Sequence, residues 1–509
     1  MKTSRYSEPQ ILAILRQAEG GVPVSKSLNV GSGKKLVRIS ASVDAGAYRH
    51  RRTVMEWVVK LEAKNGWGEV ETIEVGKIER RLVGLTADEV GLTLAEGKEL
   101  LGELGRLVLQ TQMEEYTTCA RVCPECMKMR KQRDCRTRKV QTLFGTITVD
   151  APRISVCPCM NTWGFLDVSM SPLAELLPDR CTPEMRRLQA ELSAKHSYRE
   201  TARLLAMLLP CEPPNHATMR NRTHRVAAEL ESQAAAEPNV DAGPNRDAEM
   251  IVFIDGAHIR AAPGYQTRHI DVTVGKVEVS GRPPRRFAFA AKGAVSPLAG
   301  IRQALQERGW QPGSSVTVLS DGEAALPGLI RAAVREPVTC ILDWWHISMR
   351  VQHIEQALRG VYALEPRHQA ELDMVACRIG RLRHLIWNGY HSEAHDELIG
   401  LRHMTSEVAH LNGEKFRPKV ARLLWNCDDL RRYLANNTAS LIDYGARYRS
   451  KLPISTSRAE GCVDEIANTR MAKKQRMRWS PQGAHRISVV RAAVLDCRLK
   501  VSAELACAA

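Results

Sequence analysis

Two aspartates stand where a side chain could take part in metal chemistry. Asp255 and Asp321 each end an apolar run, in "MIVFIDG" and "SVTVLSDG", and each precedes a glycine. Carboxylate oxygens are the ligands that Mg²⁺ prefers, and two such ions can activate a hydroxyl and stabilise the leaving oxyanion in phosphodiester cleavage. Taken singly, an Asp-Gly pair is typical of a turn. Together, on strands that pair, the two aspartates predict a site for two Mg²⁺ or Mn²⁺ ions.

A third carboxylate is expected from the C-terminal part of the chain. Glu460 follows a Ser-rich helix start at residues 455–457, and Asp464 lies one turn further on as a reserve ligand. An acid in the first helical turn is also ordinary, because it interacts well with the helix dipole. The run "RMAKKQRMRW" follows, so a carboxylate here would face a phosphate backbone. From this run we expect DNA contacts by Lys473, Lys474, Arg476, Arg478 and Trp479.

The ten residues "CILDWWHISM" place an aspartate three positions before a histidine. Asp343 follows an apolar run, and two tryptophans separate it from His346. Two interpretations fit these residues. Asp343 can cap a helix whose first turn holds His346, or both can lie at the edge of a reaction centre, with Asp343 as a reserve metal ligand. The two interpretations are compatible with each other.

Two short cysteine motifs, "CPEC" and "CPC", flank a segment whose alternation around Gly145 predicts a β-hairpin. Tetrahedral zinc needs four ligands, and each motif supplies two from one turn. Cys119 and Cys135 lie nearby and could replace one member, and chance clustering of reduced thiols is the plainer alternative. We therefore predict a structural Zn²⁺ ribbon over residues 119–165. Its ligands are expected to be Cys123, Cys126, Cys157 and Cys159.

The aspartates need a sheet to bring them together, and residues 249–345 have the pattern of one. Three strand-like runs are followed by a helix, a strand, a helix and the last strand, "VTCILD". This order is that of the ribonuclease H-like plan, a mixed sheet with helices on its faces. Residues 232–248 are predicted to be a linker before the sheet. Residues 346–455 are predicted to be an all-α insertion, and 456–509 to hold the Glu460 helix and a basic C-terminal region.

The region before the cysteines has a mixed pattern. Residues 31–118 are predicted to form a small α/β region, with strands at 35–44 and 69–77 and a helix between them at 47–66. An amphipathic helix follows, with Thr93 as its N-cap, and leads into the cysteine cluster.

Residues 166–231 are predicted to be helical. Two helical segments joined by a Pro-rich turn are compatible with a helix-turn-helix whose second helix, from Thr218 to Arg225, enters a major groove. Any two-helix hairpin gives a similar pattern. If the two helices form a helix-turn-helix, the DNA contacts would include Arg220, Arg222 and Arg225.

Composition narrows the class of partner. The 509 residues include 73 Lys and Arg against 57 Asp and Glu, a net charge of +16, and such an excess favours nucleic acid. No apolar run reaches the roughly 18 residues of a membrane helix, and the N-terminal segment lacks the pattern of a signal peptide. We therefore expect no membrane partner and a reducing cytoplasm, near the nucleoid, where the fourteen cysteines would hold metal rather than form disulfides.

Two resemblances to mobile-element proteins follow from these motifs. Residues 1–30 resemble the opening of the small helix-turn-helix protein of OrfA-type insertion sequences, and that resemblance stops near Val30. Residues 65–500 resemble the DDE transposases of the ISKra-type insertion-sequence family, which share a catalytic layout with Mutator-type transposases. The markers are "VGLTLAEGKELL", the two cysteine motifs with "TLFGTITVDAPR" between them, "SPLAELLPDRCTPE", "FIDGAH", "LSDGEAAL", "DWWHISMR" and "SRAEGCVDEIANTRMAKKQRMRW".

The resemblance implies a function and roles for residues. It implies cleavage at insertion-sequence ends and strand transfer into target DNA, with Asp255, Asp321 and Glu460 as the metal-binding acids. Related transposases carry a Cys-or-Asp-x-x-His motif after the fifth strand, which Asp343 and His346 match. His346 would then act in catalysis by orienting a scissile phosphate or a catalytic acid. The partners implied are double-stranded DNA, both element ends and target, and further copies of the chain on paired ends.

The expected fold class is therefore a multidomain α+β and α/β protein. It would comprise a ribonuclease H-like catalytic domain with an all-α insertion, preceded by a zinc ribbon and a helical DNA-binding region. Two other functions fit part of the pattern. One is a catalytically inactive DNA-binding or repressor remnant of a mobile element, and the other is a ribonuclease H-like junction nuclease that cuts branched DNA without strand transfer.

Overall fold

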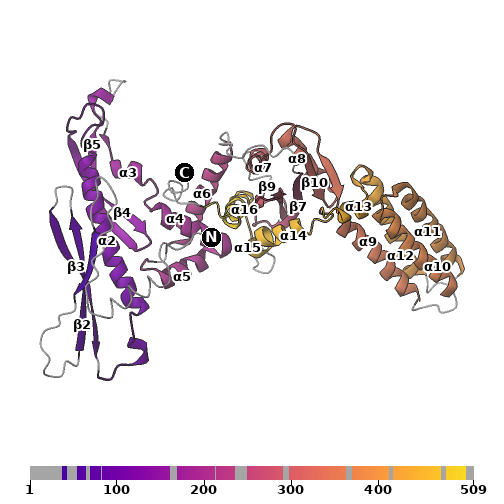
Figure 1. The fold of residues 1–509 in the computed structure, drawn as a ribbon, viewed down its shortest axis with the longest axis horizontal. Coiled ribbons are helices and arrows are strands. Elements are labelled where there is room, and N and C mark those ends of the chain that lie inside the picture. The colour runs from indigo at the N-terminus through magenta and orange to yellow at the C-terminus, as the bar shows by residue number, and fades with distance from the viewer. Residues whose placement is uncertain are drawn as a thin grey trace, which may run out of the picture. The chain divides into compact units, whose positions relative to one another are not determined.

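The chain has a mixed α+β fold that divides into two compact units, Met1–Glu115 and Tyr116–Ala509 (Figure 1). The OrfA-like segment 1–30 lies outside the described residues, as do Lys473, Lys474 and Arg476 of the basic run. The computed structural model describes residues 37–42, 54–64, 69–81, 83–160, 169–212, 214–235, 249–290, 297–362, 369–411, 417–471 and 477–499.

The first unit holds an antiparallel three-stranded sheet in the order β1-β2-β3. The helix expected at residues 47–66 is wrong, because the described part of that range is a strand. Its β-branched and aromatic residues, among them Trp57 and Val59, suit a pleated surface, and partners on both sides supply its hydrogen bonds. The strands are β1 (Val37–Ser42), β2 (Val54–Lys64) and β3 (Val70–Arg81).

The long helix α2 (Leu94–Cys119) begins where the sequence predicts, after the short helix η1 (Ala87–Glu89). The Glu96 backbone N–H donates to Thr93 Oγ1 at 3.3 Å, and the Glu96 carboxylate accepts from the Thr93 backbone N–H at 2.9 Å. This reciprocal pair is a capping box, so the Thr93 N-cap is confirmed. The Glu96 carboxylate also accepts from Arg80 of β3, which lowers its pKa to about 2.

The second unit opens with the cysteine-bearing hairpin. Strands β4 (Gln132–Thr142) and β5 (Gly145–Ser155) are antiparallel, and Gly145 has the positive φ of 127° that the turn between them needs. The hairpin predicted around Gly145 is therefore confirmed. The short helix η2 (Pro158–Met160) follows β5, and β6 (Ser169–Met170) adds a third strand at its end.

The next segment is helical, as the sequence predicts. Helix α6 continues through residues 232–235, which the sequence assigns to the linker; the rest of that linker, 236–248, lies outside the described residues. The helices are α3 (Pro172–Leu176), α4 (Pro183–Lys195), α5 (Tyr198–Leu208) and α6 (His216–Ala235).

A five-stranded sheet forms the centre of the second unit, in the order β11-β10-β7-β8-β9. Strands β7, β8 and β9 are antiparallel neighbours, whereas β10 and β11 run parallel to β7. The order of three strands, helix, strand, helix, strand is the predicted one. The elements are β7 (Met250–Arg260), β8 (His269–Glu278), β9 (Arg285–Ala290), α7 (Pro297–Gln306), β10 (Val316–Ser320), α8 (Ala325–Val334) and β11 (Thr339–Leu342).

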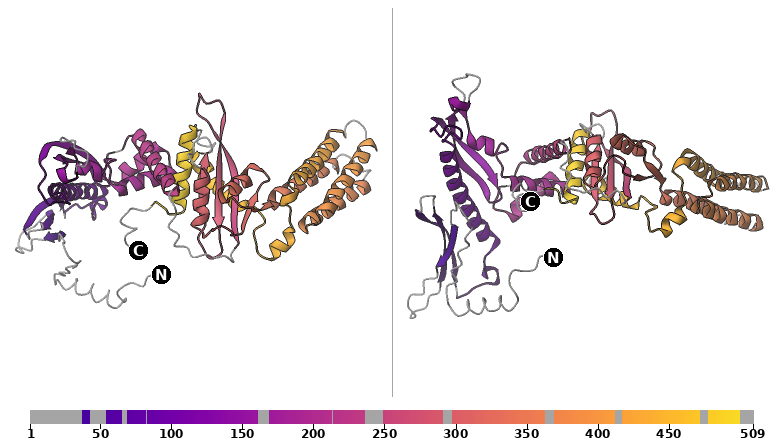
Figure 2. Two further views of the ribbon diagram at one scale, coloured as in Figure 1. Left: turned by 90° about the horizontal axis from the view of Figure 1, so that it is seen from above. Right: turned by 45° about the horizontal axis from the view of Figure 1, so that its top comes forward.

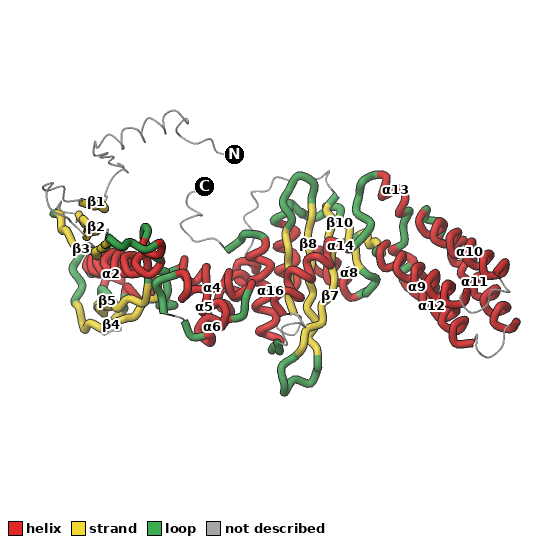
Figure 3. The backbone as a smooth tube through the Cα atoms, turned by 90° about the horizontal axis from the view of Figure 1, so that it is seen from below, coloured by secondary structure: helices red, strands yellow, loops and turns green. Residues whose placement is uncertain are grey.

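Strands β7 and β8 are much longer than their neighbours. Their pairing begins at Ile251 with Glu278 and ends at Arg260 with His269. The neighbouring strand β10 pairs with β7 only as far as Phe253. Figure 3 shows β7 and β8 as a two-stranded ribbon whose connecting loop projects from the sheet.

Helices cover both faces of this sheet. Along β7, Met250, Val252 and Ile254 pack with α7 and α8 in one core, whereas Ala257 and Ile259 pack on the other face with the C-terminal helices. The C-terminal elements are α14 (Ser457–Val463), the π-helical turn η6 (Asp464–Asn468), α15 (Thr469–Met471) and α16 (Pro481–Leu495). Helix α16 lies beside the sheet and also packs against α4 and α6 (Figure 2).

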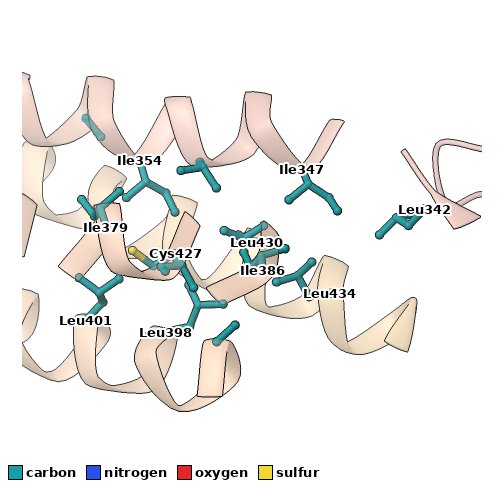
Figure 4. Close-up of a cluster of buried hydrophobic side chains, with 14 of the residues drawn as sticks. Leu342, Ile347, Ile354, Ile379, Ile386, Leu398, Leu401, Cys427, Leu430 and Leu434 are labelled. Carbon is teal, nitrogen blue, oxygen red and sulfur yellow. The ribbon is translucent and has the colours of Figure 1, made fainter. Parts of the chain in front are cut away.

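The described residues between β11 and α14 are helical or loop, as the all-α prediction requires. Their core is aliphatic and includes Ile354, Ile379 and Leu430 (Figure 4). The Trp344 backbone N–H donates to the Ile454 carbonyl at 3.0 Å, so the chain leaves and rejoins the sheet domain at one place. The helices are α9 (Trp344–Tyr362), α10 (Gln369–Trp387), α11 (His391–Leu411), α12 (Arg417–Asn436), η5 (Thr438–Ser440) and α13 (Tyr444–Arg449).

A membrane-crossing helix is absent from the described residues: none of their helices combines the necessary length with the necessary apolar character.

Candidate active site and metal centre

Strand register brings the three predicted aspartates into one row. In the pairing of β7 with β10, Phe253 lies opposite Leu319, and the same offset carried two residues on places Asp255 opposite Asp321. In the pairing of β10 with β11, Ser320 lies opposite Leu342, so the next position places Asp321 opposite Asp343. Neighbouring strands are about 4.8 Å apart. The row therefore gathers three carboxylates from segments far apart in the sequence.

Asp255 ends the apolar run, as the sequence shows, but it does not end a strand, because β7 continues beyond it. Strand β7 goes on pairing with β8 through Arg260. Asp255 shares a strand face with Phe253 and Ala257, which is the face that α14 covers. Its Oδ1 accepts from the Gly256 backbone N–H at 2.7 Å. Burial raises the pKa of Asp255, and the neighbouring charge of Asp321 raises it further.

Asp321 follows β10 directly, as predicted. Its Oδ1 accepts from the Glu323 backbone N–H at 3.0 Å, and Gly322 between them has a φ of +99°. A Cβ at Gly322 would lie 2.9 Å from Leu342 Cδ1, so the turn needs glycine for both conformation and space. The Tyr433 hydroxyl, from α12 of the helical insertion, donates to the Asp321 carbonyl at 2.6 Å. The insertion thus helps to hold this turn.

Asp343 is fully buried, and its carboxylate contacts one backbone N–H group and two side chains. Its Oδ1 accepts from the Trp345 backbone N–H at 2.8 Å, which caps α9. Its Oδ2 lies 2.8 Å from His346 Nδ1 and accepts from the Thr456 hydroxyl at 2.5 Å. Burial opposes the charge of Asp343, but these hydrogen bonds outweigh it and lower the pKa. The helix-capping interpretation is therefore correct, and Asp343 has little capacity left to bind a metal ion.

His346 is held in a defined orientation by Asp343. The hydrogen bond to Nδ1 raises the pKa of His346, and the charges of Asp321 and Glu460 act in the same direction. Its side chain is 23% exposed, so the ring is partly open to solvent. With Nδ1 engaged, Nε2 is the nitrogen left for a ligand.

Glu460 lies in the first turn of α14, the helix that packs on β7 and β8. Among the described residues its carboxylate has no hydrogen-bond or ion-pair partner. Burial raises the pKa of Glu460, and Asp255 and Asp343 add to that rise whereas His346 opposes it. Asp464, the reserve, begins a π-helical turn, and its carboxylate accepts from Asn468 at 2.6 Å. Glu460 is therefore the better ligand of the two.

The donor set has the chemistry that magnesium needs. Asp255, Asp321 and Glu460 are all partly buried, and each offers carboxylate oxygens that no described residue occupies. The charge of Asp321 raises the pKa of Asp255, and that of Asp255 raises the pKa of Glu460, so the three acids are near enough to interact. The ligand oxygens of these three acids do not all lie within 4.8 Å of one another. In the described part of the chain, the four cysteines are the group that meets that limit.

The cysteine cluster has the geometry of a tetrahedral metal site. The Sγ atoms of Cys123 and Cys159 are 3.5 Å apart, and those of Cys126 and Cys157 are 3.4 Å apart. Backbone N–H groups of the knuckle, that of Cys126 first, lower the pKa of Cys123 to about 6, which favours the thiolate that zinc binds. Cys119 and Cys135 are exposed and do not belong to the set. The predicted ligands are thus brought together.

The predicted DNA-facing residues of α6 separate into two kinds. Arg222 is buried and donates to Gln189 at 3.0 Å and to Gln141, so it joins α6 to α4 and β4 and cannot face DNA. Arg220 and Arg225 are exposed, and Arg225 forms an ion pair with Asp179. The assignment of Arg222 to the DNA surface is therefore wrong.

Trp479 is also buried, so it lies in the lining of a cavity and not on the open surface. Its backbone N–H donates to the Arg260 carbonyl at 3.0 Å, and its carbonyl accepts from the Ala262 N–H at 2.8 Å, so it extends the end of β7. Arg478 beside it is exposed.

Sequence patterns miss two residues that hold the site, Thr456 and Tyr433, and a third, Arg470, that is buried elsewhere. Thr456 contacts Asp343 across 113 residues, and Tyr433 contacts Asp321 across 112. Arg470 is 1% exposed and donates to the Ser193 carbonyl at 2.8 Å. No local periodicity or spacing signals such distant partners.

No model of a known protein family matches the chain, and a search of curated proteins finds no relative. The function is therefore inferred from the geometry of the site.

Proposed function

We propose that this protein is a DDE-type DNA transposase that hydrolyses phosphodiester bonds at the ends of an insertion sequence and joins them to target DNA. The observation that carries the proposal is the pairing of Phe253 with Leu319 on neighbouring parallel strands, two residues before Asp255 and Asp321, with Glu460 on the helix that covers the same face. The sheet order β11-β10-β7-β8-β9 supports a ribonuclease H-like domain around these acids.

Each residue has a distinct part in this proposal. Asp255, Asp321 and Glu460 would hold two Mg²⁺ ions, which when bound supply an activated hydroxyl and stabilise the leaving oxyanion. His346, oriented by Asp343, presents Nε2 to a phosphate oxygen, and its raised pKa favours the protonated, hydrogen-bond-donating form. Asp343 also holds Thr456, the residue at the start of the Glu460 helix. One buried carboxylate thus positions a histidine and an acid together.

Charge and the cysteine cluster support a DNA substrate. The net charge of +16 favours a polyanion, and exposed arginines occur on α6 at Arg220 and beside the C-terminal helix at Arg478. The zinc ribbon adds a basic hairpin, in which Arg133 and Arg136 of β4 are exposed. These groups would bind element ends and target, and pairing of two ends would bring two copies of the chain together.

The proposal is tested by cleavage of a supercoiled plasmid that carries the DNA flanking the coding sequence on both sides. We expect Mg²⁺- or Mn²⁺-dependent cuts at those flanks, followed by joining to a second plasmid. Asp321→Asn and Glu460→Gln should abolish both steps, whereas binding of the flanking DNA should remain. Glu323→Gln is the matched control, because Glu323 is exposed two residues from Asp321 and its side chain is not part of the site.

The outcomes separate the competing functions. Cleavage of branched DNA without joining would indicate a junction nuclease. Tight binding to the flanks with no cleavage by the wild type would indicate a DNA-binding remnant. Cleavage that survives in both acid variants would overturn the catalytic assignment.

A further inference from the structure

A cavity of about 640 Å³ with a basic lining lies between α5, α6 and the start of α16, and it is separate from the carboxylate site. Three arginines contribute to its lining, and no acidic residue does. The other polar lining residues are hydroxyl, amide, imidazole and indole groups. The lining includes Tyr198, Arg220, His224, Arg470, Arg478 and Trp479.

Arg470 makes this cavity unusual. It is 1% exposed, and among the described residues no carboxylate pairs with it. It donates to the Ser193 carbonyl and to Met477 Sδ, at 3.2 Å, and it lies over Tyr198 and Trp479, whose ring centres are 5.4 and 5.0 Å from its guanidinium carbon. Burial lowers its pKa to about 10. A buried cation without a counter-charge is costly, so an anion in the cavity would relieve that cost.

The surrounding groups favour an anion as well. Arg220 and Arg478 are exposed and have no acidic partner in the described part of the chain. His224 is neutral near pH 7, because burial and then the charge of Arg220 lower its pKa to about 4. The N-terminal ends of α5 and α16, capped by Ser197 and Ser480, both contribute residues to the cavity.

The cavity is joined to the carboxylate row through one strand. Trp479 pairs by backbone hydrogen bonds with Arg260 and Ala262 at the end of β7, and Asp255 lies on the same strand five residues before Arg260. Five strand residues span about 17 Å. That span equals about five base-pair steps of B-DNA, at about 3.4 Å each. One DNA molecule could therefore reach both places.

We propose that this cavity binds a phosphodiester of a DNA strand, with Arg220 and Arg478 at its mouth and Arg470 inside. The inference deepens the proposed function, on which it rests, by naming where the substrate backbone is held. The exposed arginines act by charge and hydrogen bonding, so the contact is independent of base sequence.

The test measures binding of a short labelled duplex by the full-length protein in chelator, over a range of salt concentrations. Arg220→Gln and Arg478→Gln should each weaken binding about fivefold to tenfold, and each should reduce the magnitude of the slope of log K against log salt by about 0.9. Arg335→Gln is the matched control, since Arg335 is exposed at the end of α8, on the other face of the sheet. It should leave the slope unchanged.

A wild-type slope in both pocket variants would overturn the inference, and so would an equal loss in Arg335→Gln. Inorganic phosphate and a mononucleotide form the second arm. If the pocket variants lose affinity for these small anions but bind duplex normally, the site serves a free phosphate compound and the DNA assignment is wrong. Because chelator prevents cleavage, this result does not depend on catalysis. A protein that binds duplex through the cavity but never cuts would refute only the proposed function.

Discussion

Asp255 and Asp321 each lie two residues beyond Phe253 and Leu319, the last registered pair of two neighbouring parallel strands, and 66 residues separate the two aspartates in the chain. Each is followed by glycine, yet the two glycines differ. Asp255 lies inside a strand that continues, whereas Asp321 begins a turn. The same dipeptide thus serves two backbone conformations within one site.

Substituting the two glycines should separate these roles. Gly322→Ala places a Cβ 2.9 Å from Leu342 at a φ of +99°, so we expect it to lower the free energy of unfolding by about 1–3 kcal/mol and to impair metal-dependent cleavage. Gly256→Ala meets no atom within 4 Å and should change stability by less than about 0.5 kcal/mol. Thermal unfolding of both variants checks this. Equal losses would mean that the Asp321 turn does not require glycine.

Tyr433 should act as a positioning residue. Tyr433→Phe removes the hydroxyl that donates to the Asp321 carbonyl, so we expect a loss of about 1 kcal/mol in stability and a several-fold higher Mn²⁺ concentration for half-maximal cleavage. Tyr448→Phe is the control, because Tyr448 is 62% exposed. A stability loss with an unchanged Mn²⁺ requirement would show that Tyr433 only supports packing.

The Asp343–His346 pair should make stability depend on pH. The pKa of His346 is raised, so its contribution is complete below the ordinary histidine value of 6.5 and is lost as pH rises through the raised value. The pKa of Asp343 is lowered, so its contribution is complete above the ordinary value of 3.8 and is lost as pH falls through the lowered value. The coupling should therefore be greatest between these two ordinary values.

A double-mutant cycle measures that coupling. Asp343→Asn, His346→Gln and the double variant should give an interaction energy of about 1.5–3 kcal/mol near pH 6, which decreases on the alkaline side. Urea unfolding at several pH values supplies the numbers. A coupling that stays constant up to pH 9 would mean that the charge on His346 does not matter.

The cysteine cluster should hold one zinc ion per chain. Cys126→Ser removes a ligand and should abolish stoichiometric zinc and destabilise the β4–β5 hairpin, whereas Cys135→Ser should retain the metal, because Cys135 lies outside the cluster. Elemental analysis of the purified variants distinguishes them. Since protons compete for thiolates, acidification should release the ion. Retention of zinc by Cys126→Ser would show that another residue can complete the site.

Sequence patterns predict those elements of this protein whose apolar residues recur with a regular local spacing. The order of strands and helices around Asp255 and Asp321 follows from apolar periodicity, and the hairpin between the cysteine pairs follows from alternation around Gly145. The prediction of a helix at 47–66 is wrong. Charged residues within Val54–Lys64 interrupt the apolar alternation of a strand, and pairing with β1 and β3 stabilises the strand.

Contacts between distant residues account for the remaining errors. Arg222 is suited by type to a DNA surface, but its partner Gln141 lies 81 residues away and draws it inside. Trp479 follows a basic run, but backbone pairing with the end of β7 buries it. The spacing of Asp343, Trp345 and His346 predicts the helix cap, but the contact of Asp343 with Thr456, 113 residues away, has no local signal.

The hydrogen bond between the Trp344 N–H and the Ile454 carbonyl joins the first and last residues of a long helical excursion. Its two ends meet within one backbone contact, so the length of the excursion does not set the spacing of the acids on either side. The excursion is thus a module anchored at its base, where Trp344 also packs against Trp387 and Tyr444.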